Sequence, residues 1–254
     1  MTMVEVRSLS SNRRRRAGGS RSRRASPSPL VLPGAVALAA VLSAAVIGRL
    51  VDTGNTRGLD HSCRRRMRRV RSNPLSRAAA IATGLGEPIV QVPLSILASI
   101  AVARRSPVPA IRGRASPYHA RNWVTSASPL LASVAAILAH HGIKLVFRRR
   151  RPPGAWLHGN TEPSFPSGHV SIVTATACAS AYSLVRRGVH PAKVIPVTVL
   201  VPCSVGLSRV YLDKHWASDV IGGFLVGLGI AAGSVVVGEA VRAPVDRRLG
   251  VSAS

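Results

Sequence analysis

Six long apolar stretches divide this 254-residue chain, and they constrain its fold more than any other feature. They are Leu30–Gly48, Ala78–Ala103, Trp123–Phe147, Gly168–Val185, Val194–Leu207 and Val220–Val237. A helix that crosses a bilayer needs about 20 apolar residues. The fifth stretch has only fourteen, so it can span only by borrowing flanking residues or by lying shielded within the bundle. The pattern predicts an all-α fold, a transmembrane bundle of six spans.

The two ends of the chain are expected to be tails outside the membrane domain. Residues 1–29 carry eight arginines among serine, glycine and proline without apolar periodicity, which is typical of a disordered basic tail. An arginine-rich targeting peptide is the alternative. We expect one membrane domain over residues 30–241 and a short C-terminal tail over residues 242–254.

The net charge of +26 limits the classes of binding partner that this chain suits. Such a charge suits nucleic acid, an anionic membrane or an anionic substrate. Because aromatic and basic residues do not alternate in a way that suggests base stacking, we expect no nucleic-acid partner. Membrane lipids and an anionic substrate remain.

Three short segments supply groups that bind phosphate. Lys144 stands seven residues before Arg151-Pro152, a Pro-Ser-Gly-His run occupies residues 166–169, and Ser208-Arg209 follows. Arginine binds phosphate through a planar fork and lysine acts as a point charge, so Lys144, Arg151 and Arg209 make a phosphate cradle. Ser167 and Gly168 precede an apolar run, where free N–H groups at a helix start bind anions.

Two histidines and one aspartate complete a set for phosphoryl transfer. His215 and Asp219 are four residues apart and share one helical face, so the carboxylate can orient the ring. In that arrangement the ring attacks phosphorus. His169 then protonates the leaving oxygen and later activates water.

Metal or cofactor chemistry is not expected. The chain has three cysteines, Cys63, Cys178 and Cys203, and two of them lie inside apolar stretches. Carboxylates near the motifs are too few for a hard-cation site. We therefore expect no metal and no cofactor.

Together the three segments resemble the signature of the type 2 phosphatidic acid phosphatase (PAP2) superfamily, which includes lipid phosphate phosphatases and vanadium haloperoxidases. The resemblance covers residues 144–219, and every signature position is matched. It implies a phosphohistidine at His215, with Asp219 as its partner and His169 as the acid. It also implies phosphate ligands at five positions: Lys144, Arg151, Ser167, Gly168 and Arg209.

The implied function is a membrane phosphatase that hydrolyses a lipid phosphate or diphosphate without metal. Candidate substrates are a polyprenyl diphosphate, a prenyl-linked sugar phosphate and phosphatidate. A haloperoxidase-like enzyme that uses vanadate, and a non-enzymatic basic protein that binds anionic lipid, are the alternatives. The oligomeric state is left open.

Sidedness follows from the loops. With six spans, the loops that carry the motifs emerge on the same face. Basic residues are more numerous on the face of the N-terminus, which favours a cytoplasmic N-terminus and an extracytoplasmic site. The arginine-rich, alanine-rich and valine-rich composition suggests a bacterial plasma membrane.

Further segments invite two readings each. Apolar residues recur at helical spacing over residues 59–70, against six arginines between residues 64 and 71, which predicts an interfacial helix rather than a solvated loop. Residues 148–150 are expected to be a basic flank of the third span. Glu87 either pairs with a site arginine or lies uncharged at a helix break beside Pro88.

Three groups near the motifs are left outside the predicted site. Asp213 and Lys214 are expected to form a surface loop. His140 and His141 are expected to line a pore or the membrane interface.

Overall fold

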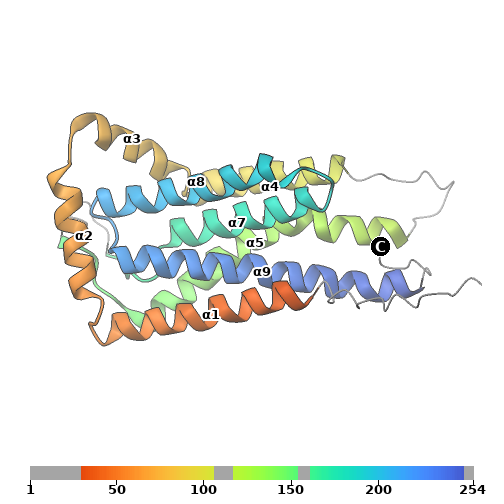
Figure 1. Cartoon of the computed structure of the whole chain (residues 1–254), viewed down its shortest axis with the longest axis horizontal. Helices are drawn as coiled ribbons and strands as arrows, with labels where there is room; N and C mark the ends of the chain where they lie inside the picture. The colour runs from red at the N-terminus through yellow and green to blue at the C-terminus, as the bar shows by residue number, and fades with distance from the viewer. Residues whose placement is uncertain (1–29, 106–116, 154–160, 249–254) are drawn as a thin grey trace, which may run out of the picture.

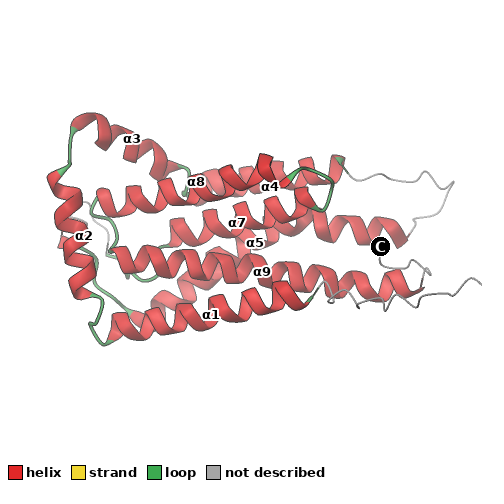
Figure 2. Ribbon diagram, in the orientation of Figure 1, coloured by secondary structure: helices red, strands yellow, loops and turns green. Residues whose placement is uncertain are grey.

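The computed structural model describes residues 30–105, 117–153 and 161–248. Within these ranges the chain forms helices joined by loops, without strands (Figure 2). The helices are α1 (Val31–Asp52), α2 (Arg57–Arg69), α3 (Asn73–Gly84), α4 (Pro88–Arg104), α5 (Pro117–Phe147), α7 (Gly168–Val185), α8 (Pro191–Tyr211) and α9 (Ala217–Arg248). The predicted all-α fold is confirmed.

The long helices run side by side as a bundle, and α2 lies across one end of it (Figure 1). Helix α7 is central and contacts α4, α5, α8 and α9, while α1 packs on α9 and α3 packs on α8. Ala132, Ala136, Ile172, Ala175 and Ala179 form a fully buried core cluster between α5 and α7. Small side chains let membrane helices approach closely, so this core is built largely of alanine.

Five helices are long and apolar enough to cross a membrane, namely α1, α5, α7, α8 and α9. Helices α3 and α4 meet the same criteria together, which gives up to six spans. The short fifth stretch does borrow its flanks, because α8 runs from Pro191 to Tyr211. The span of α9 ends at Val241, and the helix itself continues to Arg248, beyond the expected domain boundary.

The second predicted span is broken rather than continuous. Helices α3 and α4 meet at an angle of 56° across Leu85, Gly86 and Glu87. Pro88 starts α4, and the residue before a proline is driven out of the helical region, as the ψ of 138° at Glu87 shows. A Cβ at Gly86 would lie 2.8 Å from the Cβ of His169, so the break presses against the start of α7.

Glycines bring α9 against α7. A Cβ at Gly223 would lie 2.8 Å from the carbonyl oxygen of Ser167, and one at Gly227 would lie 2.6 Å from that of Ser171. Real side chains cannot approach so closely, so only glycine permits this separation. The close approach sets the start of α7 beside the start of α9.

Helix α2 confirms the predicted helix over residues 59–70. Its residues Cys63 and Met67 pack against the buried cluster that includes Val170 and Val205. Most of its arginines are exposed on the other faces. The predicted basic tail, residues 1–29, lies outside the described residues.

Candidate active site

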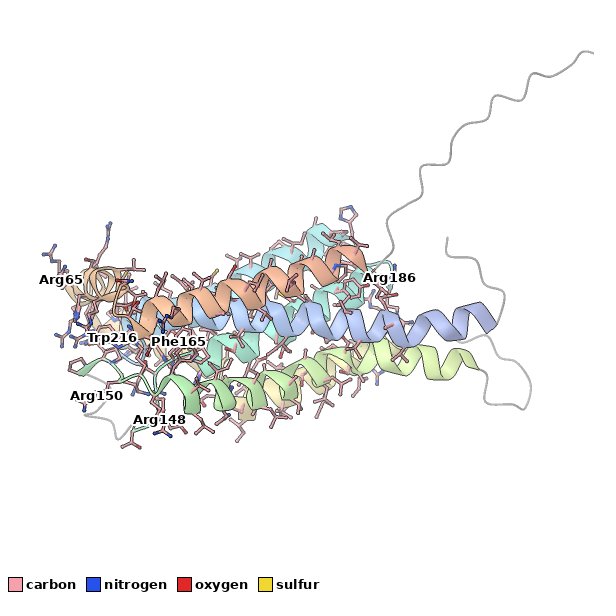
Figure 3. The ribbon with its side chains drawn as sticks, turned by 90° about the horizontal axis from the view of Figure 1, so that it is seen from below. Arg65, Arg148, Arg150, Phe165, Arg186 and Trp216 are labelled. Atoms are coloured by element: carbon pink, nitrogen blue, oxygen red, sulfur yellow. The ribbon has the colours of Figure 1, made fainter. Side chains whose placement is uncertain are left out.

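The three sequence motifs meet at the end of the bundle that α2 crosses. Figure 3 shows Arg148, Arg150, Phe165 and Trp216 at this end, with Arg186 at the opposite one. The N–H of Ser167, at the start of α7, donates to the carbonyl of Asp219, at the start of α9, at 3.0 Å. This bond joins the second motif to the third.

The ring of His215 lies between Asp219 and Arg151, and its position fixes its tautomer. Arg151 Nη1 is 3.2 Å from His215 Nε2, and Asp219 Oδ2 is 3.5 Å from His215 Nδ1. Because arginine can only donate, Nε2 is the acceptor and the ring proton sits on Nδ1, facing the carboxylate. The nitrogen that faces Arg151 therefore carries a lone pair.

His215 is also held neutral. Its side chain is 2% exposed, and burial lowers its pKa to about 3. The positive charges of Arg209 and Arg151 add to this effect, while Asp219 opposes it. A neutral imidazole is the form that can act as a nucleophile.

Three groups fix the Asp219 carboxylate besides His215. Arg149 Nη1 donates to Oδ1 at 2.5 Å, and the Trp216 N–H donates to Oδ2 at 2.8 Å. The Ser164 hydroxyl also donates to Oδ2. A fully buried carboxylate is costly unless it is paired and hydrogen-bonded, and this one is both.

Arg149 is therefore more than a basic flank, and that expectation was wrong for this residue. Its second nitrogen, Nη2, donates to Asp60 of α2 at 2.5 Å. Asp60 is 1% exposed and accepts from both the N–H and the hydroxyl of Ser218. Arg149 thus ties α2 to the start of α9. Arg148 and Arg150 are exposed, as expected of a flank.

The lysine and the first arginine of the predicted cradle share a neighbour. Lys144 Nζ donates to the carboxylate of Glu162 at 2.8 Å, and Arg151 Nε donates to the backbone carbonyl of Glu162. The Glu162 side chain is 62% exposed, whereas that of Lys144 is 8% exposed. The hydrogen bond from Lys144 lowers the pKa of Glu162, so the carboxylate is an anion.

Two buried donors face the site without a partner. Arg209 Nη1 donates to Thr83 of α3, but its Nε has no acceptor among the described residues. The hydroxyl of Ser167 is also buried and without a partner in the described part of the chain. Buried polar atoms are nearly always hydrogen-bonded, so these two atoms suit a ligand that accepts hydrogen bonds.

The start of α7 differs from the expectation in one respect. Ser167 and Gly168 were both predicted to offer N–H groups, but the N–H of Ser167 is used by Asp219. The N–H of Gly168 opens the helix, where it has no helical partner. A Cβ at Gly168 would lie 2.6 Å from Nε2 of His140, so a side chain there would have to displace the His140 ring. His140 is buried against the site, not in a pore or at the interface.

His169 pairs with a carboxylate from outside the motifs. Its Nε2 is 2.8 Å from Glu87 Oε1, at the break between α3 and α4. Of the two sequence alternatives for Glu87, its position at a helix break beside Pro88 is confirmed. The expected arginine partner was wrong, because the carboxylate is hydrogen-bonded to a histidine.

The expectation for Asp213 was also wrong. The residue is buried rather than part of a surface loop, and Arg64, Arg68 and Arg71 of the α2 region surround it. Together with the Arg149–Asp60 pair, these contacts fasten α2 over the loop that carries His215. Lys214 is half-buried.

The predicted site residues thus lie together, and the groups that sequence reasoning missed are their carboxylate and arginine partners. Within the described ranges, no group of three or more His, Cys, Asp or Glu side chains is arranged to hold a metal ion. The sequence contained one signal for the missed groups, since Asp60 and Glu87 are two of only nine acidic residues.

Comparison with known proteins relates this chain to a family of phosphatases. The model of the PAP2 superfamily matches residues 126–242. Phosphatidylglycerophosphatase B of Bacillus subtilis is 37% identical over 90 residues, which are 34% of this chain and 44% of the relative. Decaprenylphosphoryl-5-phosphoribose phosphatase of Mycobacterium tuberculosis is 34% identical over 127 residues, 48% of this chain and 63% of the relative.

A third relative, the lipid A 1-phosphatase of Porphyromonas gingivalis, is 36% identical over 85 residues, 34% of this chain and 17% of its own length. In every case the match spans less than two thirds of the relative.

The fold also matches a solved structure. The transmembrane PAP2 type phosphatidylglycerolphosphate phosphatase from Bacillus subtilis superposes with a TM-score of 0.68 at 22% identity, over 83% of this chain and 98% of that one. With its apolar helices, this fold makes the chain an integral membrane protein. The resemblance seen in the motifs is confirmed, and the chain carries a PAP2 superfamily domain over residues 126–242.

Proposed function

We propose that this protein is a phosphatase that hydrolyses the phosphate ester of a membrane lipid through a covalent phosphohistidine. The observation that carries the proposal is the orientation of His215. Its Nε2 lone pair faces the cluster of Lys144, Arg151 and Arg209, and its proton faces Asp219.

The substrate phosphate would be held by these three cations, the Ser167 hydroxyl and the Gly168 N–H. A phosphoryl group in transfer carries negative charge on its outer oxygens, and stabilising this charge provides most of the catalysis. Two contacts would be exchanged on binding: the phosphate replaces Glu162 at Lys144, and it draws Arg151 away from Nε2.

The reaction has two steps. In the first, the His215 Nε2 lone pair forms a bond to phosphorus, the ester P–O bond breaks, and the leaving alkoxide takes a proton from His169. In the second, neutral His169 takes a proton from water, the water oxygen bonds to phosphorus, and the P–N bond breaks. Inorganic phosphate leaves, and His215 is neutral again.

The substrate class rests on position and on the relatives. The site lies at the ends of spanning helices, where a lipid head group meets water while its tails stay in the bilayer. The three relatives are named as phosphatases of lipid or prenyl phosphates. Of the three relatives described above, the phosphatase of a prenyl-linked sugar phosphate matches this chain over the most residues, so we propose that class first, followed by prenyl diphosphates and phosphatidate.

The proposed location is a bacterial plasma membrane with the site on the extracytoplasmic side. The excess of basic residues on the N-terminal face supports this orientation. A single cysteine placed by mutagenesis at exposed Ser62 of α2, at the site end of the bundle, tests it in a background without the three native cysteines. Labelling of whole cells by a membrane-impermeant maleimide supports the orientation, and labelling only after lysis contradicts it.

The activity is tested with the purified full chain in detergent. Phosphate release is measured from a prenyl-linked sugar phosphate, a prenyl diphosphate, phosphatidate and phosphatidylglycerol phosphate, each with and without EDTA. We expect release that EDTA leaves unchanged and that vanadate blocks. Mass spectrometry of peptides after rapid alkaline quenching should locate phosphate on His215. Release from none of the four substrates would reject the proposal.

A further inference from the structure

A basic cavity lies next to the candidate active site, with which it shares Arg149. It has a volume of about 250 Å³ and is lined by Arg57, Asp60, His61, Arg149, Arg150 and Trp216. We call it the Trp216 pocket. Its walls come from α2, from the loop after α5 and from the loop before α9.

Uncompensated positive charge sets this cavity apart from the rest of α2. Farther along the chain, Arg64 and Arg68 of α2, and Arg71 beyond its end, pair with Asp213. In the Trp216 pocket the one carboxylate, Asp60, is already occupied by Arg149 and Ser218. Arg57 and Arg150 have no carboxylate partner within the part of the chain that the structure describes.

Three contacts fix the position of the Trp216 ring in the wall of this pocket. Its ring nitrogen donates to the backbone carbonyl of Arg150 at 2.9 Å. The His61 ring packs edge-on against it at 5.2 Å, and the Arg149 guanidinium lies 5.7 Å from its ring centre. His215, on the active-site side, is the preceding residue.

The cavity also lies at the level of a membrane surface. Val51, in the last turn of the spanning helix α1, forms part of its floor. Tryptophan is enriched at the membrane–water interface, and arginines near an anionic surface attract phosphate head groups. Figure 3 shows Arg150 and Trp216 together at this end of the bundle.

We propose that the Trp216 pocket is a second binding site, for a phosphate anion, separate from the site that contains His215. The forks of Arg57 and Arg150 bind the phosphate oxygens, and the apolar end of α1 lies beside any attached lipid. The anion is either the phosphodiester of an anionic lipid head group or free inorganic phosphate. Arg149 lines this pocket and donates a hydrogen bond to Asp219. An occupant of the pocket therefore contacts the arginine that holds the carboxylate beside His215.

Tryptophan fluorescence tests the site without any assay of activity. The variant Trp123→Phe, Trp156→Phe leaves Trp216 as the only tryptophan of the chain. In detergent, it is titrated with dioctanoylphosphatidylglycerol, with inorganic phosphate, and with dioctanoylglycerol, which has no phosphate. We expect a saturable change with the first probe and none with the third. A response to inorganic phosphate as well identifies the free anion as sufficient, and its absence identifies the lipid head group.

Charge variants separate this pocket from the active site. Adding Arg57→Ala and Arg150→Ala should weaken binding by roughly thirtyfold, because each arginine contributes about a fivefold factor. The matched control is Arg65→Ala with Arg69→Ala, which removes two exposed charges of α2 that do not line the pocket, and it should bind like the parent. The pair Arg57→Lys, Arg150→Lys keeps both charges and should keep most of the affinity.

Two results would overturn the proposal. One is an unchanged fluorescence response in the Arg57→Ala, Arg150→Ala variant, which would place the anion in the His215 site. The other is equally weak binding by the alanine and lysine pairs, because charge would then not be what holds the anion.

Discussion

Two imidazole–carboxylate pairs lie at the same end of this bundle, and their surroundings differ sharply. In one, the side chains of His215 and Asp219 are 2% and 0% exposed, and the carboxylate is held by Arg149, Ser164 and Trp216. In the other, the side chains of His169 and Glu87 are 17% and 46% exposed. No other described group is hydrogen-bonded to the Glu87 carboxylate.

The contrast matches the tasks that we propose for the two histidines. A nucleophile must meet phosphorus in line, and small errors of position are costly, so a ring fixed on both sides is suited to attack. An acid that serves first a leaving group and then a water molecule must reach two positions. A partner at a helix break, held by one contact, leaves the ring that freedom. Substitutions at several residues test this difference between the two pairs.

The largest effect is expected at the proposed nucleophile. His215→Ala should lower kcat by about 10⁵-fold or more, because no covalent intermediate can form. Phosphate release from the best lipid substrate measures it. His141→Ala, which removes an exposed histidine of α5, serves as the control and should keep full activity. Substantial turnover by His215→Ala would reject the assignment.

Asp219→Asn tests the orienting carboxylate. The amide can donate toward Nδ1 and so favours the wrong tautomer, which should lower kcat by about 10³- to 10⁴-fold. It also leaves a buried arginine less well paired, which should cost about 3 kcal/mol of stability. Thermal unfolding in detergent and steady-state kinetics measure the two effects. The exposed Asp52→Asn should change neither.

Arg149→Lys tests the bridge between α2 and Asp219. Lysine keeps the charge but cannot bind Asp219 and Asp60 with separate nitrogens. We expect kcat to fall by about 10- to 100-fold with KM little changed, since Arg149 positions Asp219 and does not touch substrate. A rise in KM at constant kcat would mean instead that Arg149 binds phosphate.

Glu87→Gln tests the looser pair and should have a smaller effect, about tenfold in kcat. Glutamine can still contact the ring but carries no charge. Stability should change by less than about 1 kcal/mol, because the pair is half-exposed. Glu239→Gln, at the far end of the bundle, is the matched control for activity. If Glu87→Gln were as damaging as Asp219→Asn, the distinction between the two pairs would fail.

A different kind of effect, on stability against pH, follows from the burial of His215. The pKa of folded His215 is about 3, and that of an unfolded histidine is about 6.5. Between these values the unfolded chain binds a proton that the folded chain does not, so His215 makes stability fall as pH falls from about 6.5 toward 3. Melting temperatures of the parent and His215→Asn from pH 7 to pH 4 should converge as the pH is lowered. Parallel curves would contradict the burial effect.

Much of the fold could be read from the chain because the relevant signals are local. The apolar length of Gly168–Val185 marks α7 to the residue. The helix break at Glu87 was only one of two alternatives that the sequence offered. Gly86 and Pro88 permit a bend there, but its angle depends on packing against His169.

The candidate site divides in the same way. His215 and Asp219 are four residues apart and do lie together, but His215 is in the loop before α9, so the expected shared helical face was wrong. Arg149 and Asp60 are 89 residues apart, and Glu87 and His169 are 82 apart. No pattern in either segment predicts such a pair.

The sequence by itself determined that this is a helical membrane protein whose phosphate-binding and histidine motifs emerge on one face. Apolar length and short-range spacing act through the local geometry of the helix, which each segment carries alone. Only the tertiary structure decided which charges fix those motifs in place. The partners of Asp219 and His169 are chosen by how α2, α3 and α4 pack against α7 and α9, and that packing depends on contacts between segments distant in the chain.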